Sequence, residues 1–89
     1  MTMNADKLFK EVKSSVPELL ENGQAEIIFG NYISEKFNVY TKSSNDEDID
    51  IIEVEYNGET KDIHCENINN TEYVARLIMH CFAKLYLER

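Results

Sequence analysis

The stretch IIEVEYNGETKDIHC, residues 51–65, decides the fold of this chain because it has the local features of a β-hairpin. Two runs of alternating apolar and polar residues flank Asn57-Gly58, a pair that favours a two-residue type I′ turn. Such a turn fixes the register of the two strands. On the apolar face it pairs Tyr56 with Glu59, Val54 with Lys61 and Ile52 with Ile63, and Cys65 follows the same parity. On the other face it pairs Glu55 with Thr60, Glu53 with Asp62 and Ile51 with His64.

Two further strands are predicted before the hairpin. Residues 35–42, EKFNVYTK, alternate apolar and polar side chains, and residues 25–29, AEIIF, form a short apolar run. Residues 30–35, GNYISE, are then a loop or a hairpin turn, and residues 43–48, SSNDED, are a polar loop. Together with the hairpin, these segments predict a sheet of four antiparallel strands.

A helix is predicted before the strands. Over residues 4–22 the apolar side chains recur at helical spacing, with Asn4 as the N-cap and Gly23 as the residue that ends the helix. Pro17 interrupts this pattern, and the sequence SVPE that begins at Ser15 has the spacing of a capping box. We therefore expect the helix to kink, or to start again, near Ser15.

A second helix is predicted over residues 70–88, with Asn69 or Thr71 as its N-cap. Its polar residues form one row at i, i+4 spacing, which consists of Glu72, Arg76, His80, Lys84 and Glu88. The remaining apolar arc spans roughly 200°, more than one face of a sheet covers. Either the first helix packs beside it on the same sheet, or a second copy of the chain covers the rest. In the first case the contacts come from Leu8, Val12 and Val16.

The predicted fold class is therefore α+β, in the order α-β-β-β-β-α, with an antiparallel sheet and the helices packed on one face. The 89 residues suit one domain, residues 1–89. No apolar run approaches the ~20 residues of a membrane helix, and the start MTMNADKLFKEVK has no apolar signal region. We expect a cytoplasmic protein that does not bind membranes and whose two cysteines are reduced.

The net charge of −8 is concentrated in one segment. Residues 46–62 contain eight carboxylates and one lysine, whereas the rest of the chain contains nine acids and eight bases. Direct binding of nucleic acid is not expected, because such binding depends on Lys and Arg side chains that neutralise phosphates. A basic protein is the complementary partner.

The sequence predicts no catalytic site, no metal site and no cofactor. Two pairs, His64-Cys65 and His80-Cys81, bring the residue types of a zinc site or of a Cys–His nucleophile. Neighbours on a strand point to opposite faces, and neighbours on a helix diverge by about 100°, so the four side chains do not converge. Both cysteines fall on core-facing positions, where a free cysteine packs as a small apolar residue.

Two interpretations of the acidic segment remain open. Charged residues keep a sheet edge from aggregating, which is a solubilising role. Against this, Glu53 opposite Asp62 places like charges together, which destabilises the hairpin. Alternate carboxylates on a strand also stand about 6.6 Å apart, a separation like that of successive phosphates. If the segment binds a basic partner, the binding residues are Asp46, Glu47, Asp48, Asp50, Glu53, Glu55 and Asp62.

The first helix, the short strands, the hairpin EVEYNGETKDI, the segment ENINNTE and the long last helix together resemble a family of small acidic anti-CRISPR proteins encoded by prophages. The resemblance lies in size, charge and element order over most of the chain, and no residue role is transferred. It implies an inhibitor that occupies the basic site with which guide-loaded type II-A Cas9 reads the motif beside its DNA target. That site works through arginines, which carboxylates complement.

We therefore expect a non-enzymatic acidic protein of phage or mobile-element origin that acts as a DNA mimic in the cytoplasm of the host cell. Its expected partner is a basic nucleic-acid-binding protein of the host, and the resemblance implies a Cas9-type effector. The alternative is a small homodimeric adaptor whose acidic hairpin only keeps the protein soluble. The sequence leaves open whether the chain is a monomer or a homodimer.

Overall fold

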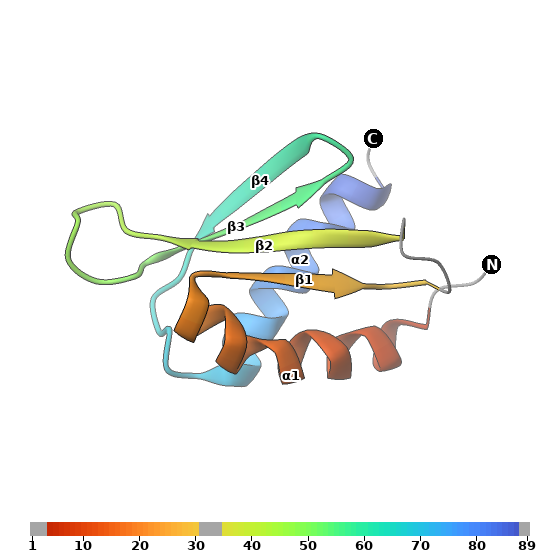
Figure 1. The fold of residues 1–89 in the computed structure, drawn as a ribbon, viewed down its shortest axis with the longest axis horizontal. Coiled ribbons are helices and arrows are strands. Elements are labelled where there is room, and N and C mark those ends of the chain that lie inside the picture. The colour runs from red at the N-terminus through yellow and green to blue at the C-terminus, as the bar shows by residue number, and fades with distance from the viewer. Residues whose placement is uncertain (1–3, 31–34, 88–89) are drawn as a thin grey trace.

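The computed structural model describes residues 4–30 and 35–87, and Figure 1 shows how their helices and strands are arranged. In chain order the elements are helix α1 (Ala5–Asn22), strands β1 (Gln24–Ile28), β2 (Lys36–Lys42), β3 (Ile51–Tyr56) and β4 (Glu59–His64), and helix α2 (Thr71–Leu87). The strands form one antiparallel sheet in the order β1-β2-β3-β4, so each strand lies beside its neighbour in the sequence. The predicted α+β class and element order are confirmed.

The hairpin of β3 and β4 has the predicted turn and register. Asn57 and Gly58 adopt positive φ angles of 55° and 84°, which a type I′ turn requires at both positions. All six predicted pairs between the two strands are observed. Because the register is the predicted one, Ile52, Val54 and Cys65 are buried on the core side.

Strands β1 and β2 lie within one residue of their predicted bounds. β1 begins at Gln24, one residue before the predicted start, and β2 begins at Lys36, one residue after it. Phe37 and Val39 of β2 are buried, as the alternating pattern predicted. The predicted loop or turn at residues 30–35 falls largely on residues 31–34, which lie outside the described part of the chain.

Helix α1 begins and ends as predicted. The Asn4 side chain accepts a hydrogen bond from the Lys7 N–H at 3.1 Å, which satisfies one of the free donors at the start of the helix. Gly23 adopts a left-handed conformation, with φ 79°, directly after the last turn. Its N–H bonds to the Leu19 carbonyl at 2.8 Å, so the helix ends in a left-handed cap and β1 starts at once.

The predicted interruption near Ser15 is wrong, because α1 is continuous through Pro17. The Ser15 hydroxyl caps no new helix; it donates to the Glu11 carbonyl at 2.9 Å, as does the Ser14 hydroxyl. Pro17 lies on the exposed side of α1, whereas its neighbour Val16 is 1% exposed. Packing of the buried side therefore holds the helix together across the one backbone hydrogen bond that a proline cannot donate.

Both predicted N-caps of α2 are wrong, because the cap is the residue between them. The Asn70 side chain accepts a hydrogen bond from the Tyr73 N–H at 3.0 Å, and the Asn70 carbonyl accepts one from the Val74 N–H at 2.9 Å. Thr71 is the first residue of the helix, and Asn69 lies in the turn before it.

The exposed side of α2 carries the predicted polar row. Arg76 donates a hydrogen bond to Glu72 one turn earlier at 3.0 Å, and this bond lowers the pKa of the Glu72 carboxyl. The last predicted member, Glu88, lies outside the described residues. In the described part of the chain, neither helix combines the length and the hydrophobicity that crossing a membrane requires.

Both helices pack on one face of the sheet, and α1 lies beside α2 (Figure 1). α1 covers mainly β1, and α2 covers β3 and β4. The α1 contacts expected from the sequence are confirmed, because Leu8, Val12 and Val16 are buried in the core that the two helices share. At the centre of this core, Phe37 of β2 stacks on Phe82 of α2 with the ring centroids 4.1 Å apart. The wide apolar arc of α2 is thus covered largely within one chain.

Candidate functional site

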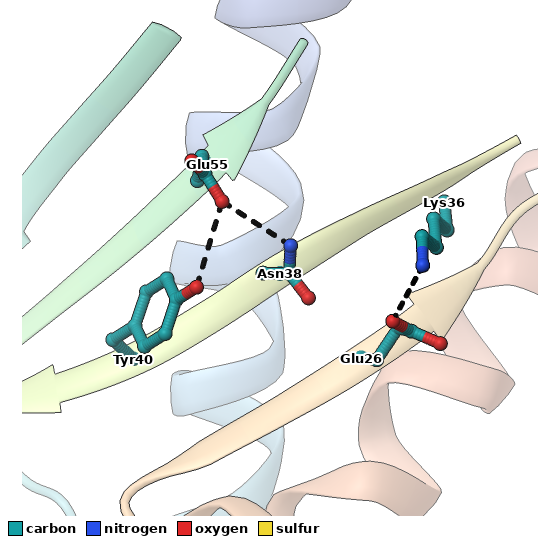
Figure 2. A network of polar contacts seen from close by, with 5 residues as sticks. All are labelled: Glu26, Lys36, Asn38, Tyr40 and Glu55. Carbon is teal, nitrogen blue, oxygen red and sulfur yellow. Dashed lines mark hydrogen bonds and ion pairs between the residues drawn. The ribbon is translucent and has the colours of Figure 1, made fainter. Parts of the chain in front are cut away.

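The second face of the sheet, which we call the open face, carries no helix among the described residues, and Figure 2 looks onto part of it with α2 behind the sheet. Because side chains alternate along each strand, every second residue points to this face. These residues are Gln24, Glu26 and Ile28 of β1, Lys36, Asn38, Tyr40 and Lys42 of β2, Ile51, Glu53 and Glu55 of β3, and Thr60, Asp62 and His64 of β4. None of them is buried, so the open face is available to a partner.

The structure divides the seven predicted binding residues between two places. Glu53, Glu55 and Asp62 lie on the open face. The other four lie in the loop of residues 43–50, which joins β2 to β3 and projects beyond one end of the sheet (Figure 1): Asp46, Glu47, Asp48 and Asp50. We call the seven together the acidic surface. One continuous stretch of sequence thus forms two groups of carboxylates, one on the open face and one beyond its end.

A lysine of β2 offsets the predicted repulsion across the hairpin. Glu53 and Asp62 lie opposite each other, as predicted. On the other side of Glu53, the Lys42 ammonium lies 2.8 Å from the Glu53 carboxylate. The hydrogen bond to Glu53, supported by the charges of Glu53 and Asp62, raises the pKa of Lys42. The sequence alone does not reveal this contact, because the loop between β2 and β3 carries no turn motif that fixes their register.

Glu55 is held by two neighbours on β2. Its carboxylate accepts hydrogen bonds from the Asn38 amide at 3.2 Å and from the Tyr40 hydroxyl at 3.5 Å (Figure 2). Burial first, and then the charge and the hydrogen bond of Glu55, raise the pKa of Tyr40. Glu55 therefore presents its charge to the open face beside two hydrogen-bond donors of β2. The alternation of residues 36–42 had already placed Asn38 and Tyr40 on one face, but not beside Glu55.

A second lysine reduces the charge of the open face near β1. Lys36 forms an ion pair with Glu26, with 2.9 Å between the ammonium nitrogen and the carboxylate oxygen (Figure 2). The open face thus carries four carboxylates, those of Glu26, Glu53, Glu55 and Asp62, together with the ammonium groups of Lys36 and Lys42. It is acidic, but less so than the hairpin sequence alone indicated.

The loop of residues 43–50 is shaped by its own hydrogen bonds. The Asp50 carboxylate accepts two bonds from Ser44, one from the hydroxyl and one from the backbone N–H at 2.8 Å. These two bonds lower the pKa of Asp50, so this carboxylate stays ionised to lower pH than usual. The Glu47 N–H is shared between the Ser43 hydroxyl at 3.1 Å and the Asn45 side-chain oxygen at 3.0 Å.

The tip of this loop exposes three consecutive carboxylates. Asp46 adopts a positive φ of 62°, which aspartate tolerates better than most residues. Asp46, Glu47 and Asp48 are all exposed, and no ion pair links them to another described residue. The loop therefore holds the least compensated negative charge of the acidic surface.

The two His-Cys pairs separate as the sequence predicted. Cys65 and Cys81 are each 2% exposed, whereas His64 and His80 are exposed. Burial raises the pKa of Cys65, and it raises the pKa of Cys81 to about 11. Both thiols therefore stay protonated near neutral pH, without the thiolate that attacks a substrate or binds a metal. Among residues 4–30 and 35–87, no three His, Cys, Asp or Glu side chains are grouped so as to hold a metal ion.

Comparison with known proteins finds no significant match to this chain. No protein-family model matches the chain, no curated protein is significantly similar to it, and no solved structure has a significantly similar fold. The function must therefore be argued from the acidic surface and its neighbours.

Proposed function

We propose that this protein is a non-enzymatic binding protein whose acidic surface occupies the basic, nucleic-acid-binding surface of a host protein. One observation carries the proposal: the face of the sheet without helices leads, at one end, into a projecting loop with three exposed carboxylates. A partner that approaches this side meets carboxylates on two strands and on the loop. Solubility alone does not require such a concentration of like charge, because a few scattered charges protect a sheet edge.

The arrangement of the carboxylates suits a partner that normally holds a nucleic acid. Glu53 and Glu55 are two residues apart on β3, which corresponds to about 6.6 Å along the strand. Proteins bind nucleic-acid backbones with Lys and Arg side chains spaced for successive phosphates. Glu55 is already held in place by Asn38 and Tyr40, so a cation that binds it does not have to order it first.

The finer proposal is an inhibitor of phage or mobile-element origin that acts on a Cas9-type effector in the host cytoplasm. It rests on the resemblance in size, charge and element order to small acidic anti-CRISPR proteins. Such an effector reads the motif beside its target with arginines that contact bases in the major groove. Arginines of this kind bind carboxylates with paired hydrogen bonds, so the acidic surface is a chemically suitable competitor.

The structure weakens the reason for the alternative, a homodimeric adaptor. It rests on an apolar arc of the last helix that is wider than one sheet face covers. In the structure α1 packs beside α2, and much of this arc is buried, with Ala75 and Ile78 of α2 at most 1% exposed. The acidic surface is therefore the better starting point for a functional test.

The test compares two variants of equal charge. The first reverses the exposed loop acids, in Asp46→Lys, Glu47→Lys and Asp48→Lys. The second reverses three exposed acids elsewhere, in Glu11→Lys and Glu21→Lys on α1 and Glu59→Lys on β4. The binding partner is guide-loaded type II-A Cas9, and the measured quantities are its association rate with each variant and the inhibition of its DNA binding.

We expect the loop variant to associate about tenfold more slowly than the wild type or worse, because opposite charge accelerates encounter and fixes the docked orientation. The control variant should stay close to the wild type, and the difference should shrink as salt is added. If both variants lose binding equally, only net charge matters and the acidic surface is solubilising. If the wild type does not bind this effector at all, the Cas9 proposal fails, and a pull-down from host lysate with salt elution tests the broader one.

A further inference from the structure

Strand β1 lies at an edge of the sheet, and its hydrogen bonds to β2 reveal which of its backbone groups are left over. The Thr41 N–H donates to the Gly23 carbonyl at 3.0 Å, just before β1, and the Phe29 N–H donates to the Glu35 carbonyl at 2.8 Å, just after it. In an antiparallel pair, residues that bond to the neighbouring strand alternate with residues that do not. The odd-numbered residues from 23 to 29 therefore bond toward β2.

The even-numbered residues of β1 direct their backbone N–H and C=O groups away from the sheet. These residues are Gln24, Glu26 and Ile28, and in the described part of the chain no strand lies beyond them. β1 contains neither lysine nor proline, and its pairing with β2 is continuous, without a bulge; the one charged residue within it is Glu26. The other edge strand, β4, carries Lys61 and Asp62 in its middle. β1 is therefore the edge with fewer charged residues along its outward row of hydrogen-bonding groups.

A depression of about 340 Å³ lies beside the free edge of β1. It is lined by Glu18 and Asn22 of α1, Gln24, Ala25 and Glu26 of β1, and Asn38 and Tyr40 of β2. Its lining comes from α1 on one side of β1 and from the open face on the other. The depression therefore reaches around the free edge of β1. Its lining among the described residues contains two carboxylates, one on each side of that edge, and no Lys or Arg side chain, but one of the two, Glu26, is already paired with Lys36 at the rim.

We infer that an extended basic segment of a partner protein binds here by adding a strand to β1. The outward N–H and C=O groups of Gln24, Glu26 and Ile28 would pair with its backbone. Side chains of the added strand alternate between the two faces. Those on one side meet Glu26 and Tyr40 on the open face, and those on the other meet Glu18 of α1. Lys or Arg side chains on either side of the segment thus find a carboxylate.

Charge selects this occupant over a second copy of the chain. Two copies paired through β1 would bring together two chains of net charge −8 and two sets of Glu18 and Glu26. A basic segment instead brings opposite charge to these carboxylates. The contact stands apart from the acidic surface and does not depend on the proposed function, because it shares no residue with that surface.

The first experiment uses a ten-residue peptide of alternating arginine and threonine as the probe. Amide hydrogen exchange of the full chain is followed by NMR, with and without the peptide. We expect exchange at Gln24, Glu26 and Ile28 to slow by about tenfold or more, because their N–H groups become hydrogen-bonded. Unchanged exchange at these three amides in a saturated complex would overturn the inference.

N-methylated peptides separate strand addition from simple charge attraction. Two control peptides carry N-methyl groups on every second residue, in the two alternating phases, and keep all arginines. We expect one phase to bind at least about tenfold more weakly than the unmodified peptide, because each lost backbone hydrogen bond weakens binding. If both phases bind like the unmodified peptide, the arginines adhere without forming a strand and the inference is wrong.

Matched variants test the carboxylates. Glu26→Gln should weaken peptide binding about two- to fivefold, the range of exposed ion pairs, whereas Glu59→Gln on the opposite edge strand should not. Lys36→Gln should tighten binding, since it frees Glu26 from its ion pair, and Lys42→Gln is the control of equal charge. If Glu26→Gln and Glu59→Gln change binding equally, and Lys36→Gln and Lys42→Gln do too, then peptide affinity depends only on net charge and the inference is wrong. The loop variant with Asp46, Glu47 and Asp48 reversed should keep the exchange protection in β1, so failure of the proposed function and failure of this inference can be told apart.

Discussion

Among single residues, Cys81 links the core most directly to pH. Its thiol is 2% exposed, and burial raises its pKa from the usual 9.0 to about 11. In the unfolded chain the thiol ionises near its usual pKa, so between about pH 9 and 11 the folded state holds a proton that the unfolded state has lost. Stability is then lost as the pH rises through this range, whereas below it the thiol contributes no pH dependence.

We predict that Cys81→Ala flattens the alkaline part of the stability profile. Ionisation of this thiol should cost the wild type about 2 kcal/mol of unfolding free energy as the pH rises from about 9 to 11, and about 1 kcal/mol between about pH 8 and 10. The variant should be less stable at neutral pH, since it leaves a cavity, yet should lose less on going to high pH. Urea unfolding near pH 8 and near pH 10 measures both effects. Tyr40→Phe is run in parallel, because the pKa of Tyr40 is raised as well. Equal alkaline losses in the wild type and in Cys81→Ala would contradict the prediction.

Lys42 is the residue that allows Glu53 and Asp62 to face each other. We predict that Lys42→Gln lowers the midpoint of thermal unfolding at low salt, because two like charges then oppose each other across the hairpin without a nearby cation. Added salt should reduce the loss, since it screens exposed charges. Lys36→Gln is the control, because its partner Glu26 faces Asn38 rather than another carboxylate. A loss that does not respond to salt would show that the aliphatic part of Lys42 matters more than its charge.

At the level of elements, α1 tolerates a proline in its interior. Pro17 cannot donate a hydrogen bond to the carbonyl one turn earlier, and its side chain is exposed. We predict that Pro17→Ala raises the free energy of unfolding by about 1–3 kcal/mol, because it restores that donor without removing any buried contact. Urea unfolding measures the change, with Lys10→Ala on the same exposed side as a control that should be nearly neutral. A lower stability for Pro17→Ala would mean that the helix depends on the geometry of the proline.

The elements differ in how far their sequences determine them. The hairpin was predictable to the residue because Asn57-Gly58 imposes a turn conformation that fixes every pair beyond it. The cap of α2 was not, because Asn69, Asn70 and Thr71 are all good N-caps and sit side by side. Only the packed position of the helix selects Asn70 among them. The continuity of α1 through Pro17 was missed for the same reason, since buried contacts with distant residues outweigh the local signal.

For the whole molecule, the packing of α1 against α2 leads us to expect a monomer. Only two large apolar side chains in the described part of the chain are well exposed, Ile28 at 46% and Leu87 at 72%. We predict a mass of 10.4 kDa by light scattering. Leu8→Ala should cost about 2–5 kcal/mol of unfolding free energy without changing that mass, because Leu8 is part of a core within one chain. Twice the mass would show instead that a second copy covers the exposed apolar residues.

The candidate site was predictable in composition but not in geometry. The sequence identifies the seven carboxylates and their excess over basic residues, because charge can be counted. It does not reveal that Lys42 reaches Glu53, that Tyr40 reaches Glu55, or that Glu18 and Glu26 flank one free edge. These contacts depend on the register of β1, β2 and β3. In that part of the sheet no two-residue turn is available to set the register from the sequence.

The order of the strands has a consequence for biosynthesis. Each strand pairs with the one made just before it, so the sheet can assemble step by step as the chain leaves the ribosome. The contact of α2 with α1 joins segments from the two ends of the chain described here, and Phe37 gains its stacked partner only when Phe82 has been made. Until then the part of the apolar face formed by β3 and β4 lacks its covering helix. We therefore expect the nascent chain to complete its core only when α2 is available.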